Sequence, residues 1–164
     1  MMGAMGCEAR VTLTHMDREV LFLCTGNYYR SRFAETYFNA RAAQAGVKWR
    51  AVSRGIAAEL GAGLPGPLSP LVIDRLTVLG LGSAADTRAP LQLQETDLAA
   101  ADLVIALDET EHAPLMQQRF AAWADQIIYW NVPDAHLLKP EDALVRIADS
   151  VDALLQQLGA GSPA

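Results

Sequence analysis

The apolar run VLFL at residues 20–23, which ends on Cys24, constrains the fold of this chain more than any other feature. Polar residues do not alternate with apolar ones in this run, so the strand predicted at residues 19–24 must be covered on both faces. Strands of this kind are typical of parallel sheets. Apolar side chains then recur at helical spacing over residues 30–45, before Gly46, a usual helix stop. The sequence therefore predicts a strand, a tight loop and a helix.

This alternation continues along the chain. Short apolar runs predict strands at 49–53, 102–107 and 126–130, and helical patterns are found at 69–79, 109–123 and 140–158. Pro114 is expected to interrupt the helix at 109–123, and Gly159 to end the last helix. The order favours an α/β fold with three layers, in which a four-stranded parallel sheet has helices on both faces. Ligands of such folds bind outside the carboxyl ends of the strands, where Cys24 lies.

The chain length of 164 residues fits one domain that needs neither metals nor disulfides for its core. We expect residues 1–18 to form a flexible N-terminal extension and residues 19–160 to form the domain. The stretch GAGLPGP at 61–67 is interpreted as a surface loop, because the segments on either side are each too small for an independent core.

Composition excludes several classes of function. A net charge of -6 argues against a general nucleic-acid binder, and the longest apolar runs are too short to cross a bilayer. The first residues lack the features of a secretory signal, and Cys7 and Cys24 form neither a disulfide framework nor a metal knuckle. We therefore expect a reducing, cytoplasmic location. The three histidines, at 15, 112 and 136, lack metal-ligand spacing and are expected at the surface, so no metal or other cofactor is predicted.

The loop after the first strand has the composition of an anion site. Gly26 and Asn27 tolerate left-handed backbone angles, so the loop can curl with successive N–H groups pointing inward. The helix that begins near Arg30 adds its positive end, and the planar guanidinium can hold two oxygens of a tetrahedral oxyanion. An arginine is unfavourable at this end of a helix unless an anion offsets its charge. This pattern indicates a bound oxyanion.

The same positive field favours a nucleophilic thiolate at Cys24, and Ser31 could donate a hydrogen bond to the sulfur. Taken alone, Cys24 could be a small buried hydrophobic residue at a strand end, but the surrounding loop favours the catalytic interpretation. Tyr28 and Tyr29 lie inside the loop and could either line the pocket rim or belong to the core.

The stretch VLFLCTGNYYRSRFAE closely resembles the signature of the low-molecular-weight protein tyrosine phosphatases, Cys-x5-Arg-Ser with a Gly-Asn pair, which related arsenate reductases share. The resemblance extends loosely over residues 19–158. It implies that Cys24 is the nucleophile and that Arg30 clamps the phosphate. The other residues of the substrate-binding loop would then be Thr25, Gly26, Asn27, Tyr28, Tyr29 and Ser31.

The resemblance also implies a general acid near the carboxyl end. In the matching stretch YWNVPDAH this residue is Asp134, with Ala135 where the family has proline. Asp134 would protonate the leaving group and then activate water. Ser53 resembles the family serine that braces the loop asparagine. The chain departs from the family pattern further on: Arg32 replaces a proline, Arg54 a small residue, and His136 and Leu137 an aromatic pair.

These features predict hydrolysis of a phosphate monoester, phosphotyrosine or another aryl phosphate, through a phosphocysteine on Cys24, with inorganic phosphate as product. The partner would be a phosphorylated protein or a small aryl phosphate, and we expect a monomer or weak dimer that binds neither nucleic acid nor membranes. Two alternatives remain. The loop could reduce arsenate with an external thiol, since no cysteine follows Cys24. It could also bind phosphate with weak turnover, which the departures at Arg32, Arg54 and Ala135 would favour.

Overall fold

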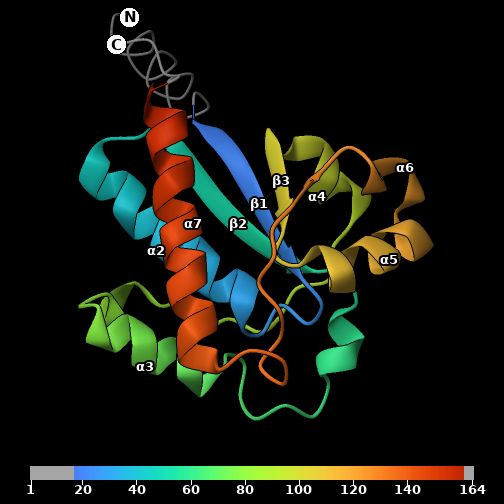
Figure 1. Cartoon of the computed structure of the whole chain (residues 1–164), viewed down its shortest axis with the longest axis horizontal. Helices are drawn as coiled ribbons and strands as arrows, with labels where there is room; N and C mark the ends of the chain where they lie inside the picture. Colours follow the sequence, from blue (N-terminus) through green and yellow to red (C-terminus); the bar gives the residue numbers. More distant parts are fainter. Residues whose placement is uncertain (1–16, 161–164) are drawn as a thin grey trace, which may run out of the picture.

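The computed structural model describes residues 17–160, which form a three-layer α/β fold around one parallel sheet (Figure 1). The strand order is β2-β1-β3-β4, with every neighbouring pair parallel. The strands are β1 (Arg18–Cys24), β2 (Trp49–Gly55), β3 (Leu103–Ala106) and β4 (Ile128–Tyr129). The predicted four-stranded parallel sheet is therefore confirmed, and the strand that ends on Cys24 lies inside it.

Helices cover both faces of the sheet, as expected (Figure 1). On one face lie α2 (Arg30–Ala45), α3 (Pro70–Val78) and α7 (Pro140–Ala160). On the other lie α4 (Glu95–Ala100), α5 (Glu109–Arg119) and α6 (Ala121–Ala124). Two short 3₁₀ helices, η1 (Ala58–Gly61) and η2 (Gly82–Ala84), lie in the connections. No helix within residues 17–160 has the length and apolar character needed to span a membrane.

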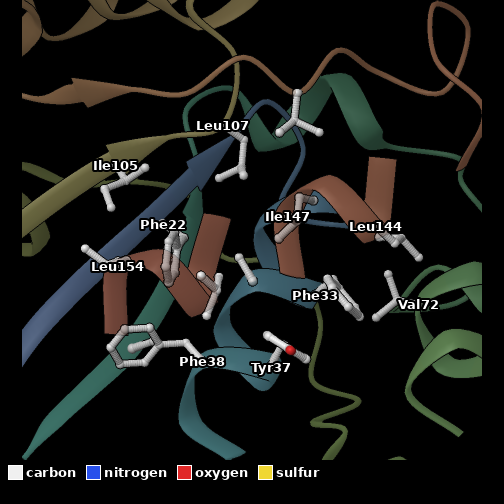
Figure 2. Close-up of a cluster of buried hydrophobic side chains, with 14 of the residues drawn as sticks. Phe22, Phe33, Tyr37, Phe38, Val72, Ile105, Leu107, Leu144, Ile147 and Leu154 are labelled. Carbon is white, nitrogen blue, oxygen red and sulfur yellow. The ribbon is translucent and has the colours of Figure 1, made fainter. Parts of the chain in front are cut away.

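The apolar run of β1 divides its side chains between the two faces. Val20 and Phe22 belong to the core under α2 and α7, and Leu21 and Leu23 to the core under the other helices; all four are fully buried. Figure 2 shows Phe22 beside Phe38 in the first core, where the ring centroids lie 6.0 Å apart. Burial on both faces is the reason why this segment lacks polar alternation.

Local signals explain the ends of two helices. Gly46 ends α2 with a left-handed φ of 68°, and its N–H points to the carbonyl oxygens of Ala42 and Ala43. At α3, Ser69 caps the first turn by accepting a hydrogen bond from the N–H of Leu71, and Pro70 occupies the first helical position. Both ends lie within one residue of their predicted positions.

Other boundaries were predicted wrongly. The helix expected at 109–123 divides at Phe120, whose φ of -140° and ψ of 53° are not helical, whereas Pro114 lies inside α5 without ending it. The strand expected at 126–130 is reduced to Ile128–Tyr129, and α7 continues through Gly159, which does not adopt a positive φ. Helix α4 was not predicted. Residues 61–67 are mostly exposed, as expected of a surface loop.

The N-terminal boundary also shifts by one residue. Arg18, assigned to the extension, is the first residue of β1 and pairs with Trp49 of β2. Residues 1–16, which include Cys7 and His15, lie outside the described part of the chain.

We expect Ile147→Ala to lower the free energy of unfolding by about 2–5 kcal/mol, because its fully buried side chain lies in the core between α7 and the sheet. Val145 lies on the same helix with 41% of its surface exposed, so Val145→Ala serves as the matched control. It should lower the free energy of unfolding much less. Urea denaturation of both variants measures the difference. Equal losses would show that α7 does not contribute its inner face to the core.

Candidate active site

The loop between β1 and α2 has the curled backbone that its sequence predicts. Asn27 adopts a left-handed φ of 52° and is fully buried. Gly55, at the end of β2, lies directly against this loop: a Cβ atom there would be 2.8 Å from the carbonyl oxygen of Thr25 and 3.0 Å from the N atom of Asn27. Both neighbours are backbone atoms that cannot move aside, so the close approach requires glycine.

The side chain of Asn27 fixes the direction of the hydrogen bonds around Cys24. Its Nδ2 donates to Ser31 Oγ at 3.0 Å and to Ser53 Oγ at 2.9 Å. Because Ser31 accepts from Asn27, its own hydroxyl hydrogen is available for the sulfur of Cys24, 2.9 Å away. Ser53 donates in turn to Glu35 Oε1 at 2.6 Å. Ser31 and Ser53 thus lie in one hydrogen-bond network with Asn27, and neither residue lines the pocket.

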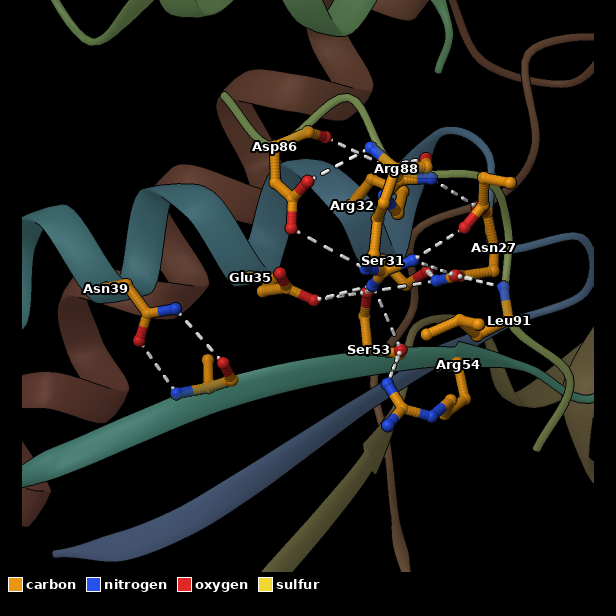
Figure 3. A network of polar contacts seen from close by, with 12 residues as sticks. Asn27, Ser31, Arg32, Glu35, Asn39, Ser53, Arg54, Asp86, Arg88 and Leu91 are labelled. Carbon is orange, nitrogen blue, oxygen red and sulfur yellow. Dashed lines mark hydrogen bonds and ion pairs between the residues drawn. The ribbon is translucent and has the colours of Figure 1, made fainter. Parts of the chain in front are cut away.

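Arg88 completes this network, although no local pattern predicted its role. Figure 3 shows it beside Asn27 and Glu35. Its Nη1 donates to Asn27 Oδ1 at 3.0 Å, and its Nη2 lies 3.1 Å from Glu35 Oε1. The N–H of Leu91 also donates to Asn27 Oδ1. The amide of Asn27 therefore has partners on both its oxygen and its nitrogen, which fixes its orientation.

Arg32, which replaces a family proline, ties three segments together. Its side chain is 3% exposed. The guanidinium donates to four main-chain carbonyl oxygens, those of Asn27, Pro67, Asp86 and Arg88. Burial, followed by the nearby charge of Arg88, lowers the pKa of Arg32. This departure from the family pattern is therefore a structural link from the loop to residues 67 and 86–88.

Arg30 lies at the start of α2, and its guanidinium is held from two sides. Nη1 donates to the carbonyl oxygen of Val132 at 2.9 Å, and Nη2 donates to Glu111 Oε2 at 2.7 Å. Burial alone would lower the pKa of Arg30, but the neighbouring Cys24, Glu111 and Asp134 raise it above its ordinary value. The guanidinium therefore stays charged beside Cys24.

Asp134, in the loop before α7, also lies near the guanidinium of Arg30. Its Oδ1 lies 3.9 Å from Arg30 Nη2, and the side chain is 43% exposed. The N–H of Ala135 donates to Asp134 Oδ1 at 2.8 Å, a hydrogen bond that the family proline could not make, since proline has no N–H. His136 is exposed, as expected, with its Nδ1 3.7 Å from Asp134 Oδ2.

Helix α5 brings a second carboxylate to the loop. Glu111 Oε2 accepts hydrogen bonds from Thr25 Oγ1 and from Arg30. Asp108 caps the helix by accepting from the N–H of Glu111. Glu111 was missed, although its place one turn beyond the carboxyl end of β3, beside β1, could have indicated it.

His112 was expected at the surface, but it is fully buried, so that prediction is wrong. Its Nδ1 accepts from the N–H of Asp108 at 2.9 Å, which places the proton of the neutral ring on Nε2, 3.2 Å from Glu111 Oε2. Burial lowers the pKa of His112, with Glu111 opposing this effect. A histidine enclosed in this way stays neutral at physiological pH.

The loop between β1 and α2 lines a pocket of about 150 Å³. Its lining residues are Cys24, Thr25, Gly26, Tyr28, Tyr29, Arg30, Leu60, Gly61, Leu64 and Asp134. The hydroxyl of Tyr28 donates to the carbonyl of Pro65 at the rim, and that of Tyr29 to the carbonyl of Pro140. Burial raises the pKa of Tyr29 to about 12, against the opposing charge of Arg30. A larger hollow between α2 and α7, about 630 Å³, contains none of these loop residues.

Comparison with known proteins agrees with this geometry. Residues 19–161 match the family model described as low molecular weight phosphotyrosine protein phosphatase. YfkJ from Bacillus subtilis is 25% identical, with a TM-score of 0.75 over 90% of this chain and 98% of its own. A low molecular weight protein tyrosine phosphatase from T. tengcongensis is 29% identical, with a TM-score of 0.68 over 89% of this chain and 100% of its own.

A third solved structure shares the fold. YwlE from Bacillus subtilis, described as an arginine phosphatase, is 23% identical, with a TM-score of 0.64 over 85% of this chain and 92% of its own. No curated protein sequence matches the chain.

We expect Arg32→Met to lower the free energy of unfolding by about 1–3 kcal/mol, because it leaves buried carbonyl oxygens without a donor. The Michaelis constant for an aryl phosphate should rise as well, since the loop loses a support. Arg41→Met is the matched control: the Arg41 side chain on the same helix is 45% exposed. Denaturation and steady-state kinetics measure both effects. Indistinguishable results for the two variants would refute the role given to Arg32.

Proposed function

Because the chain belongs to the low molecular weight protein tyrosine phosphatase family, we propose that it hydrolyses an aryl phosphate monoester, such as phosphotyrosine, through a phosphocysteine intermediate on Cys24. The observation that carries this proposal is the meeting of Cys24, Arg30 and Asp134 in one pocket of about 150 Å³. These three side chains supply a nucleophile, a cation and a carboxyl group, which are the groups that the reaction needs.

In the first step, loop N–H groups and Arg30 hold the phosphoryl oxygens while the thiolate of Cys24 attacks phosphorus. A sulfur–phosphorus bond forms as the bond from phosphorus to the leaving oxygen breaks. The carboxyl group of Asp134 gives its proton to that oxygen, so the product leaves as a neutral phenol. Loop amides that point inward before the substrate binds would stabilise the developing charge without rearranging.

In the second step, the carboxylate of Asp134 takes a proton from water, and the water oxygen attacks phosphorus. The sulfur–phosphorus bond breaks, and inorganic phosphate leaves. Sulfur departs as a thiolate, which the hydroxyl of Ser31 stabilises from 2.9 Å. Asn27 and Ser53 act through Ser31, because their hydrogen bonds direct its hydroxyl hydrogen toward the sulfur.

The pocket rim supports an aryl leaving group. Leu60 and Leu64, which are 65% and 48% exposed, line the entrance together with Tyr28. A phenyl ring entering here would be covered by apolar and aromatic side chains. We propose that the substrate is a phosphorylated protein or a small aryl phosphate. A free thiol also fits a reducing compartment such as the cytoplasm.

We expect Cys24→Ser to abolish hydrolysis of para-nitrophenyl phosphate, because a serine hydroxyl is a much weaker nucleophile than a thiolate. The variant should still bind inorganic phosphate, since the loop amides and Arg30 remain. Intact turnover in this variant would refute the phosphocysteine mechanism.

The same preparation of unmodified protein should be tested with phosphotyrosine, with phosphoarginine and with arsenate plus a low-molecular-weight thiol. Phosphoarginine is included because of the activity described for YwlE. We expect phosphotyrosine to be the best of the three. Thiol-dependent arsenite release with negligible phosphatase activity would support arsenate reduction, and phosphate binding without turnover would support a binding protein.

We expect Asp134→Asn to slow hydrolysis of an alkyl phosphate about 10²–10⁴-fold and that of para-nitrophenyl phosphate much less, because only the poor leaving group needs a proton. Asp149 of α7 is exposed, so Asp149→Asn serves as the control. It should not change the rate of hydrolysis of either substrate. The ratio of the two rate losses is the measurement. If both substrates slow equally, Asp134 is not the acid.

A further inference from the structure

The carboxylate of Glu111 touches the phosphate-clamping arginine itself. Its Oε2 lies 2.7 Å from Arg30 Nη2, and Thr25, the residue that follows the nucleophile, donates to the same oxygen. Glu111 comes from α5, beyond the carboxyl end of a neighbouring strand, and its side chain is 28% exposed. Among the described residues 17–160, Arg30 is the only arginine that lines the pocket. A pocket proposed to bind a dianion thus has a negative charge at hydrogen-bond distance from its one guanidinium.

This carboxylate stays ionised. Burial would raise the pKa of Glu111, but the nearby ring of His112 and the hydrogen bonds from Arg30 and Thr25 together hold it well below its ordinary value. His112 cannot neutralise it, because the ring is buried and neutral, with Nδ1 already accepting from Asp108. The positive charge of Arg30 is therefore balanced before any ligand arrives.

Balancing Arg30 changes what the pocket binds well. With Glu111 ionised, the remaining attraction for an anion comes from the loop N–H groups and the N-terminus of α2, which has no acidic residue in its first turn. Asp134, 3.9 Å from Arg30, adds further negative charge at the opening. The second negative charge of a dianionic ligand therefore adds less binding free energy here than it would beside an arginine without a carboxylate partner.

We propose that Glu111 is a specificity-determining residue that weakens the binding of dianionic oxyanions, above all the product phosphate, by balancing the charge of Arg30. The inference rests on the proposed function, since it assigns phosphate to this pocket. Its consequence for turnover is weak product inhibition.

The test is direct titration of inorganic phosphate by calorimetry, with the unmodified chain and with Glu111→Gln. The amide oxygen of glutamine can still accept from Arg30 and Thr25, so this variant removes the charge and keeps the hydrogen bonds. At about pH 8, where phosphate is mainly a dianion, we expect roughly tenfold tighter binding by the variant. At about pH 5.5, where it is mainly a monoanion, the gain should be clearly smaller. Glu111→Ala is the second variant, should glutamine not be tolerated.

Glu109→Gln is the matched control, because Glu109 lies in the same first turn of α5 but is exposed. It should leave phosphate affinity unchanged at both pH values. Equal or weaker binding by Glu111→Gln at both pH values would overturn the inference and leave Glu111 as a support for Arg30.

The two proposals can fail separately. If phosphate binds to neither the unmodified chain nor the Glu111 variants, the anion pocket itself is refuted, and both proposals fail. If the variant binds phosphate more tightly at the higher pH but no phosphate monoester is hydrolysed, the charge role of Glu111 stands and the proposed hydrolase activity does not.

Discussion

The side chain of Asn27 is the constraint on which the rest of the site depends. Its left-handed backbone turns the loop, and its amide joins the loop to β2, through Ser53, and to the segment before α4, through Arg88 and Leu91. Rotating that amide would exchange donors for acceptors at every contact. The orientation of the Ser31 hydroxyl toward Cys24 therefore follows from a residue that does not line the pocket.

Charge is distributed unevenly across the loop. Behind it, Arg32 and Arg88 lie near the carboxylates of Glu35 and Asp86, so the charges there balance. In front of it, Glu111 and Asp134 both approach Arg30, which leaves an excess of negative charge. Partly buried charges are screened less than exposed ones, so this arrangement sets a field across the backbone amides of the loop. Ligand affinity then reflects the amides and this field together, and not the arginine alone.

Local patterns predicted the parts of this structure that depend on neighbouring residues. The doubly buried β1 and the stop of α2 at Gly46 each follow from a few adjacent side chains. Arg88 and Glu111 could not be found in this way, because their partners in the loop lie more than 60 and 80 positions away. The strand β4 was predicted too long, since pairing with β3 decides its length and the apolar run does not.

Gly55 has a consequence for recognising distant relatives of this chain. It pairs with Cys24 at the end of the edge strand β2, and its missing side chain is what lets the loop backbone pass. A cysteine and an arginine six positions apart arise often by chance in unrelated sequences, whereas a glycine at the end of the adjacent strand does not follow from that spacing. A search for distant relatives that requires this glycine in addition to the spacing of cysteine and arginine would separate true anion-binding loops from accidental matches.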